Sequence, residues 1–295
     1  MHLIERAAER LRQSGNLNHG TAHLLQPAMN PAEPGPIQPC PSPQGLAPAG
    51  RRHPVIDDQA LQSAGMIDWT RERSRVAEEF RIVQNQILRS AFAPETAFES
   101  NSNLVMLTSA RPGEGKSFAS LNIAASIARQ RDREVLLVDI DSKADAIGRK
   151  LGLAEAAGLL NLVSDPSLTA DSLLIRTALP KLSILPVGTD PERRGELFAT
   201  RQMARVIRDL GQANADRLVI IDAPPCLSSS EPSLLAPIVG QIVLIVEAER
   251  TQRQEVEAAL DLIQACPNLT LLLNKIQLST KHSFGAYGSK YYYAS

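Results

Sequence analysis

The sequence has no run of about 20 apolar residues, the length that a membrane-spanning helix needs. Its first 13 residues, MHLIERAAERLRQ, carry charges at helical spacing and lack the apolar centre of a signal peptide. The formal net charge is only -1, and acidic and basic residues are mixed along the chain. A net charge close to zero, without blocks of one sign, gives no electrostatic reason to expect a nucleic-acid partner. These absences predict a cytoplasmic chain that reaches the inner membrane only through a partner.

Cysteine is also scarce, and tyrosine does not occur before position 287. The three cysteines, Cys40, Cys226 and Cys266, form neither a CxxC pair nor a metal-binding pattern. We therefore expect reduced thiols and no metal cluster.

Proline and apolar periodicity divide the chain into four parts. Residues 1–14 predict a short amphipathic helix, either a docking helix or a frayed end. Residues 15–67 are rich in proline and predict a disordered linker without chemistry of its own. Residues 68–280 predict the folded domain, and residues 281–295 predict a flexible tail.

The domain alternates apolar strands with amphipathic helices. This repetition predicts an α/β fold with a doubly wound, mostly parallel sheet covered on both faces. Ligands of such sheets bind at the carboxyl ends of the strands. The expected strands are Leu104–Leu107, Val135–Ile140, Leu182–Leu185, Leu218–Ile221, Ile242–Val246 and Leu271–Leu273. The expected helices are 70–92, Ser117–Arg129, Ala199–Leu210 and Glu255–Ile263.

The first strand of this alternation runs into a glycine-containing loop and then a helix. This is the context of a P-loop, here with Ala110 in place of the usual first glycine. Backbone amides of such a loop surround phosphates, and the helix start adds a positive dipole end. The residues expected to bind ATP are Gly113, Glu114, Gly115, Lys116, Ser117 and Phe118. Of these, Lys116 is expected to reach the β- and γ-phosphates, and Ser117 to ligate Mg²⁺.

Acidic residues follow two further strands. Asp139 and Asp141 are two positions apart and project to one side, where a cation would relieve their repulsion. Asp222 follows four aliphatic residues, which is the usual placement of a Walker B acid. We expect Ser117, Asp139 and Asp222 to hold Mg²⁺ directly or through water. Two solvated acids and a helix-capping Asp222 are the simpler alternatives.

The four tyrosines of the chain all lie in its last nine residues. Tyr287, Tyr291, Tyr292 and Tyr293 stand among glycines and serines, in a segment without a core-forming pattern. Mobile hydroxyl groups on an ATP-binding protein predict phosphoacceptors. The alternative is an aromatic tail that docks on a partner.

Together these motifs resemble the bacterial tyrosine kinase family. The resemblance covers about residues 70–295 and rests on PGEGKS, VLLVDIDSK, IIDAPP and YGSKYYY, with LPVGTDPERRGELF as a further similar segment. The N-terminal helix and linker resemble free-standing kinases of exosortase-linked polysaccharide clusters. Two positions depart from the family pattern. Lys143 replaces an arginine after the second Walker-type motif, and Gln84 replaces the second arginine of a subunit-contact motif, Glu-x-x-Arg-x-x-Arg, that begins at Glu78.

The resemblance implies an autokinase that transfers the γ-phosphate of ATP to tail tyrosines of a neighbouring subunit. It also implies a homo-oligomer, a role in exopolysaccharide synthesis and export, and activation by a membrane polysaccharide co-polymerase. Lys116 would stabilise the transferred group, and Asp139 or Asp141 would accept the tyrosine proton. The competing hypotheses are a partition-type ATPase, in which Arg111 would replace a second P-loop lysine, and an ATP-gated adaptor without catalysis. Asn274 is a possible adenine contact or a turn residue.

Overall fold

The structure is a computed structural model, and it describes residues 55–69, 74–92, 101–130, 133–141, 146–189, 193–214 and 216–276. The predictions for residues 1–14, for the linker before residue 55, for Cys40, for Lys143 and for the tyrosine tail concern residues outside these ranges. None of the described helices is long and apolar enough to cross a membrane.

A seven-stranded sheet forms the centre of the described domain, in the order β3-β4-β2-β5-β1-β6-β7. All neighbouring strands pair in parallel except β3 and β4, which are antiparallel. The strands are β1 Leu104–Ser109, β2 Val135–Asp139, β3 Ile175–Arg176, β4 Leu182–Leu185, β5 Leu218–Asp222, β6 Gln241–Glu247 and β7 Leu269–Asn274. The predicted mostly parallel α/β fold is therefore confirmed, and β3 is an edge strand that the sequence did not predict.

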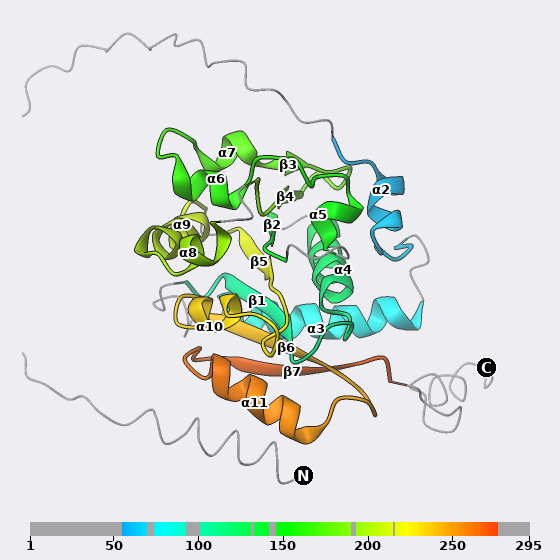
Figure 1. Cartoon of the computed structure of the whole chain (residues 1–295). Helices are drawn as coiled ribbons and strands as arrows, with labels where there is room; N and C mark the ends of the chain where they lie inside the picture. The colour runs from blue at the N-terminus through cyan, green and yellow to red at the C-terminus, as the bar shows by residue number, and fades with distance from the viewer. Residues whose placement is uncertain are drawn as a thin grey trace, which may run out of the picture. The chain divides into compact units, whose positions relative to one another are not determined.

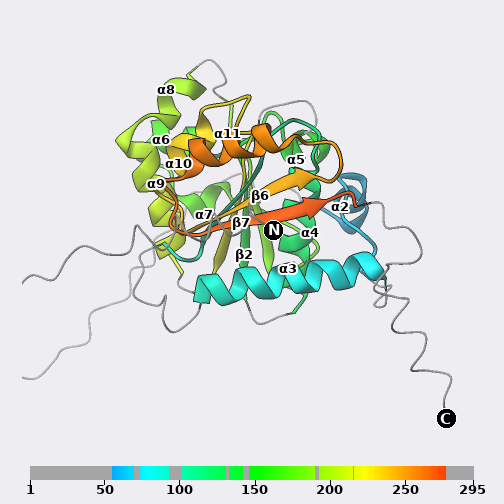
Figure 2. The same cartoon turned by 90° about the horizontal axis from the view of Figure 1, so that it is seen from below.

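Helices cover both faces of this sheet, as Figures 1 and 2 show. Along β1, Val105 and Leu107 pack toward one face and Leu104 and Met106 toward the other, each among buried apolar side chains. The first face is covered by α2 Asp58–Ser63, α3 Arg75–Phe92, α4 Lys116–Arg129 and α5 Ile147–Lys150. The second is covered by α6 Leu159–Ser164, α7 Ala170–Leu173, α8 Arg194–Phe198, α9 Arg201–Gln212, α10 Glu231–Leu235 and α11 Arg253–Ile263. In Figure 2, α3 and α11 lie on opposite sides of β6 and β7.

Gln84 is buried between two of the helices on the first face. Its side-chain oxygen accepts a hydrogen bond from Ser126 of α4, and the residue has no solvent exposure. Glu78 and Arg81, which match the subunit-contact motif, form an ion pair with each other on the exposed surface of α3. The replacement of arginine by Gln84 thus falls at a position that contacts α4, where a charged side chain would need a buried partner.

Residues 55–67 fold against the domain, so the predicted linker boundary at residue 67 is wrong. Ile56 forms backbone hydrogen bonds with Arg176 and Ala178, which attach this segment to β3 and its following turn. Asp57 caps α2 through its side chain. Leu61 has no solvent exposure, and the Trp69 ring lies 6.2 Å from the ring of Phe80. The segment folds because its apolar side chains are buried against the domain and are thereby removed from water.

Leu61→Ala tests whether α2 belongs to the cooperative domain. Truncating a fully buried leucine leaves a cavity, so we expect the free energy of unfolding to fall by about 2–5 kcal/mol. The neighbouring exposed residue provides the control, because Gln62→Ala should change stability by no more than about 0.5 kcal/mol. Urea denaturation of the full chain measures both. Equal stability of the two variants would contradict the packing described here.

Candidate functional site

The P-loop connects the end of β1 to the start of α4, as the sequence predicted. Gly113 and Gly115 have φ angles of 85° and 94°, in the left-handed region that favours glycine. Gly115 also has a packing reason to lack a side chain, since a Cβ atom there would lie 2.3 Å from Nδ2 of Asn274. The loop is therefore held tightly against the end of β7.

Glu114 braces this loop from inside the protein. Its side chain is buried and accepts hydrogen bonds from the backbone N–H of Arg111, at 2.7 Å, and of Glu247, at 3.2 Å. The hydroxyl of Thr251 also donates to it. Because these three donors already bind the Glu114 carboxylate, only the backbone of Glu114 is left to contact a phosphate group.

The end of β7 supports the loop through two further residues. The Asn274 side chain donates to the backbone oxygen of Glu114 at 2.8 Å, which makes it a loop support in this structure. The Lys275 ammonium group donates to the backbone oxygen of Gly113 at 2.6 Å and pairs with Glu247 at 3.1 Å. Sequence reasoning missed Lys275, although its place directly after a strand end was a usable signal.

Lys116 lies among the acids that the sequence predicted to converge. Its Nζ atom is 2.6 Å from Oδ2 of Asp141 and 3.0 Å from the hydroxyl of Ser117. Burial alone would lower the pKa of Lys116, but the negative charges of Asp222 and Asp141 outweigh it and raise the pKa. Lys116 is therefore a charged ammonium group in a buried site.

The carboxylate of Asp139 accepts hydrogen bonds from two backbone N–H groups, one of which belongs to Asp141. Oδ1 of Asp139 accepts the backbone N–H of Asp141 at 3.0 Å, and Oδ2 accepts that of Gly148 at 2.5 Å. Burial raises the pKa of Asp139 to about 7, and the charge of Asp222 contributes to the shift. The two N–H donors oppose it. At neutral pH this carboxyl group is thus near its midpoint of ionisation.

Asp222 lies opposite Asp139 in the register of β5 and β2. Its Oδ1 atom accepts a hydrogen bond from Ser120 at 2.9 Å, and its Oδ2 atom has no hydrogen-bond partner among the described residues. Burial raises the pKa of Asp222 despite the opposing charge of Lys116. A buried carboxylate oxygen without a donor, near a serine hydroxyl, suits a hard cation. No group of three acidic, His or Cys side chains in the described ranges could hold a metal alone, so Mg²⁺ would need phosphate ligands as well.

Two residues near the loop have partners outside the acid cluster. The ring of Phe118 lies 5.8 Å from that of Phe80, and 38% of the residue is exposed. Arg111 pairs with Glu255 of α11 at 3.3 Å. The ATP contact of Phe118 stays a prediction, and so does the role of Arg111 in the ATPase alternative.

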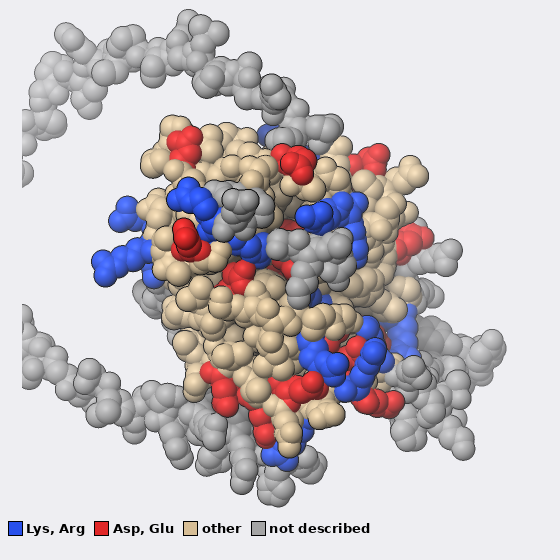
Figure 3. Space-filling view, viewed as in Figure 1, with Lys and Arg blue, Asp and Glu red and all other residues tan. Residues whose placement is uncertain are grey.

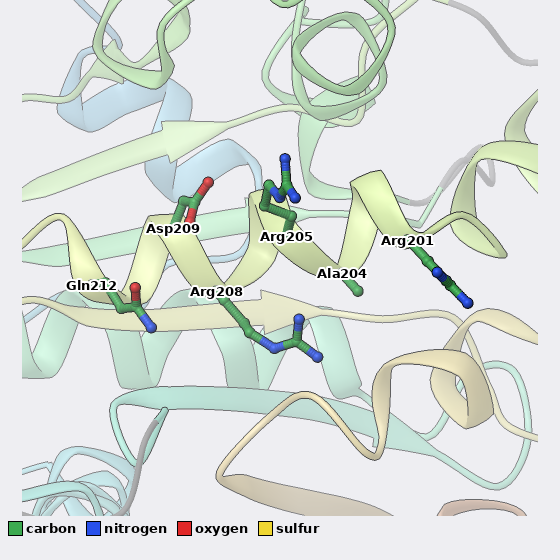
Figure 4. Close-up of a pocket in the computed structure, with 6 residues that line it drawn as sticks. All are labelled: Arg201, Ala204, Arg205, Arg208, Asp209 and Gln212. Carbon is green, nitrogen blue, oxygen red and sulfur yellow. The ribbon is translucent and has the colours of Figure 1, made fainter.

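A pocket of about 170 Å³ opens beside the acids. Leu153, Leu160, Pro186 and Val187 are among its apolar lining residues, and its polar lining is contributed by Asp139, Asp141, Arg149, Glu155, Thr189 and Arg194. A wider hollow of about 440 Å³ lies along α9, where Arg201, Arg205 and Arg208 line it (Figure 4). Figure 3 shows the basic side chains that gather over α8 and α9. Only the smaller pocket includes residues that the sequence predicted as functional.

Comparisons with known proteins agree with the motifs. The chain is 33% identical over 192 residues to EpsB of Ralstonia nicotianae, provisionally named a tyrosine-protein kinase, and the match covers 64% of this chain and 25% of EpsB. It is 28% identical to the similarly named CapB of Staphylococcus aureus, over 75% of this chain and 91% of CapB. The chain thus spans about a quarter of EpsB but nearly all of CapB. No protein-family model matches it.

A solved structure shows the same fold. The kinase domain of the Escherichia coli tyrosine kinase ETK aligns with a TM-score of 0.60 at 20% identity, over 72% of this chain and 81% of that domain. The resemblance to bacterial tyrosine kinases that the motifs predicted is confirmed in sequence and fold.

The raised pKa of Asp139 predicts how stability depends on pH in the nucleotide-free protein. An unfolded Asp ionises near pH 3.9, about three units below the folded value. Between these values unfolding releases a proton, so Asp139 makes the protein less stable as the pH rises from about 4 to about 7. Relative to wild type, Asp139→Asn should gain a few kcal/mol in unfolding free energy as the pH rises from about 4 to about 7.

Urea denaturation in the presence of a chelator measures this difference. The control is Asp171→Asn, which removes a carboxyl group at an exposed position on α7, outside the acid cluster. A pH-independent offset between Asp139→Asn and wild type would contradict the shifted pKa.

Proposed function

Because the chain resembles the bacterial tyrosine kinases in sequence and fold, we propose that it is an ATP-dependent tyrosine autokinase. In this proposal it binds Mg-ATP and transfers the γ-phosphate to tyrosines of its own C-terminal tail, from one subunit to another. The observation that carries the proposal is the convergence of Lys116 with Asp139, Asp141 and Asp222 at the end of the P-loop.

The P-loop residues would bind the triphosphate. Backbone amides around Gly113 and Gly115 would face the phosphates, and the 14-residue helix α4 directs its positive end toward them. Lys116 would exchange its contact with Asp141 for the β- and γ-phosphates, where its charge stabilises the transferred group.

Ser117, Asp139 and Asp222 would hold Mg²⁺. The unpartnered Oδ2 atom of Asp222 and the serine hydroxyl support this assignment. When bound, the cation neutralises charge on the phosphates and on the buried carboxylates. Its presence would keep Asp139 ionised, because a nearby positive charge favours the carboxylate form.

The pocket beside the acids would admit a tail tyrosine. A tyrosine hydroxyl has a pKa of about 10 and arrives protonated, so it needs a base. Asp139 and Asp141 both line the pocket and are the candidate acceptors of that proton. The proposed acceptors are Tyr287, Tyr291, Tyr292 and Tyr293.

The family resemblance supports the wider biological proposal. The chain would work in the cytoplasm as a homo-oligomer, and a membrane polysaccharide co-polymerase would recruit it to the inner membrane and activate it. Phosphorylation of the tail would then regulate exopolysaccharide synthesis and export. We propose no nucleic-acid partner.

Lys116→Met should remove the proposed activity without unfolding the protein. Loss of a charge that stabilises the transferred group typically costs about 2.7–4 kcal/mol, or roughly 10²–10³ in rate. The control is Lys181→Met, because Lys181 precedes β4 and so lies at the amino ends of the parallel strands, whereas the P-loop follows the carboxyl end of β1. In the measurement, the 295-residue chain and each variant are incubated with γ-labelled ATP and Mg²⁺, and the labelled peptides are mapped.

The same assay separates the competing functions. The kinase is supported if the tail is labelled and if this label is absent from a variant in which all four tyrosines are changed to Phe. Released phosphate without protein label would instead support an ATPase, and bound ATP without turnover would support an adaptor. Near-normal labelling of Lys116→Met would refute the role assigned to Lys116.

A further inference from the structure

A buried ion pair lies beside the acids but has no part in the chemistry proposed above. Arg194, at the start of α8, and Glu231, at the start of α10, each have a side chain that is only 9% exposed. Nε of Arg194 donates to Oε1 of Glu231 at 2.8 Å. A buried charge pair has a large desolvation cost and is weak evidence for stability, so it invites a functional explanation.

Arg194 connects this pair to the acid segment. Its Nη2 atom donates to the backbone oxygen of Ile140, the residue between Asp139 and Asp141. Its guanidinium group lies 5.3 Å from the ring centre of Phe198. The guanidinium group therefore makes three contacts, with Glu231, Ile140 and Phe198. Lysine has no planar group and cannot make the same set of contacts.

Ile140 is also held from its other side. Its backbone N–H donates to the backbone oxygen of Asp222 at 3.0 Å. The peptide group before Ile140 is thus hydrogen-bonded to the backbone of Asp222, and the peptide group after it is hydrogen-bonded to Arg194. A displacement of Arg194 would therefore move the Ile140 backbone and, with it, the neighbouring Asp139 and Asp141.

Glu231 has a second contact that keeps it ionised. Burial would raise its pKa, but hydrogen bonds from the Ser229 hydroxyl and from Arg194 outweigh that effect and lower the pKa. Ser229 and Glu231 follow the Walker B strand β5, whereas Ile140 follows β2. The network therefore joins the loops that leave the two acid-bearing strands.

We propose that Arg194 is a positioning residue for the kinase reaction. With Glu231 it fixes the Ile140 carbonyl, and so it sets Asp139 and Asp141 in register with Lys116. This inference rests on the proposed function, because it assigns Arg194 a role in the same site.

A second Arg–Glu pair gives a matched control. Arg217 and Glu134 precede β5 and β2, and their side chains lie 3.3 Å apart at the opposite ends of the same two strands. This pair is more exposed than the first, with side chains 17% and 44% exposed. Removing it perturbs the same strands without touching the acid segment.

The test compares two double variants of the full chain, Arg194→Met/Glu231→Leu and Arg217→Met/Glu134→Leu. Replacing both partners avoids leaving one buried charge unpaired, which would destabilise the fold by itself. We expect the first variant to keep a normal melting temperature and a KM for ATP within about twofold of wild type. Its kcat for tail phosphorylation should fall by about 10²-fold, as a displacement of about 1 Å can cause. The second variant should keep both constants.

Amide hydrogen exchange provides a readout that does not need activity. The N–H groups of Asp141 and Gly148 both donate to Asp139, so they report directly on the position of the acid segment. We expect these two amides to exchange at least about tenfold faster in Arg194→Met/Glu231→Leu than in wild type or in the control variant.

Arg194→Lys keeps a cation for Glu231 and serves if the double variant does not fold. It should retain stability, lose part of kcat and show faster exchange at Asp141 and Gly148. Normal kcat together with unchanged exchange, in whichever of these variants folds, would overturn the proposal. If wild type labels no tail tyrosine, the proposed function fails, and the exchange data still decide whether Arg194 holds the acid segment.

Discussion

The contact between Lys116 and Asp141 is the interaction on which the site depends. Three carboxyl groups are buried at one edge of the sheet, and Lys116 forms an ion pair with one of them, Asp141. Burial raises the pKa values of Asp139 and Asp222, and the charges of neighbouring carboxylates add to both shifts. A site with this excess of acid favours a divalent cation and a phosphate ligand that arrives with it. In this account the ion pair keeps the lysine charged and in place until a triphosphate competes for it.

Parallel strands make this concentration of acid possible. β1, β2 and β5 are neighbours in the sheet, so the P-loop, Asp139 and Asp222 all leave from the same edge. Each needs its own brace against movement. Glu114, Asn274 and Lys275 hold the P-loop, while Ser120 bonds to Asp222. Asp139 is braced by two backbone amides, and we have proposed that Arg194 supports the segment that carries one of them.

The sequence was sufficient to predict six of the seven described strands and the four longest described helices, because near-continuous aliphatic runs and the P-loop context are local signals. It also located Lys116 and the three acids. It could not predict that 55–67 would fold, since the packing of Leu61 and Ile56 depends on elements distant in the chain. For the same reason it missed the short strand β3, the partners of Glu114 and the Arg194–Glu231 pair. Each of these depends on which strand ends become neighbours, and no local pattern encodes that information.

A crystal structure with Mg²⁺ and a non-hydrolysable ATP analogue would show whether Lys116 changes its partner when a triphosphate binds. We expect Nζ of Lys116 to leave Asp141 and to lie within hydrogen-bonding distance of a β- or γ-phosphate oxygen, with Mg²⁺ near Ser117 and Asp222. A triphosphate bound elsewhere, with Lys116 still paired to Asp141 at the present distance of 2.6 Å, would contradict this expectation.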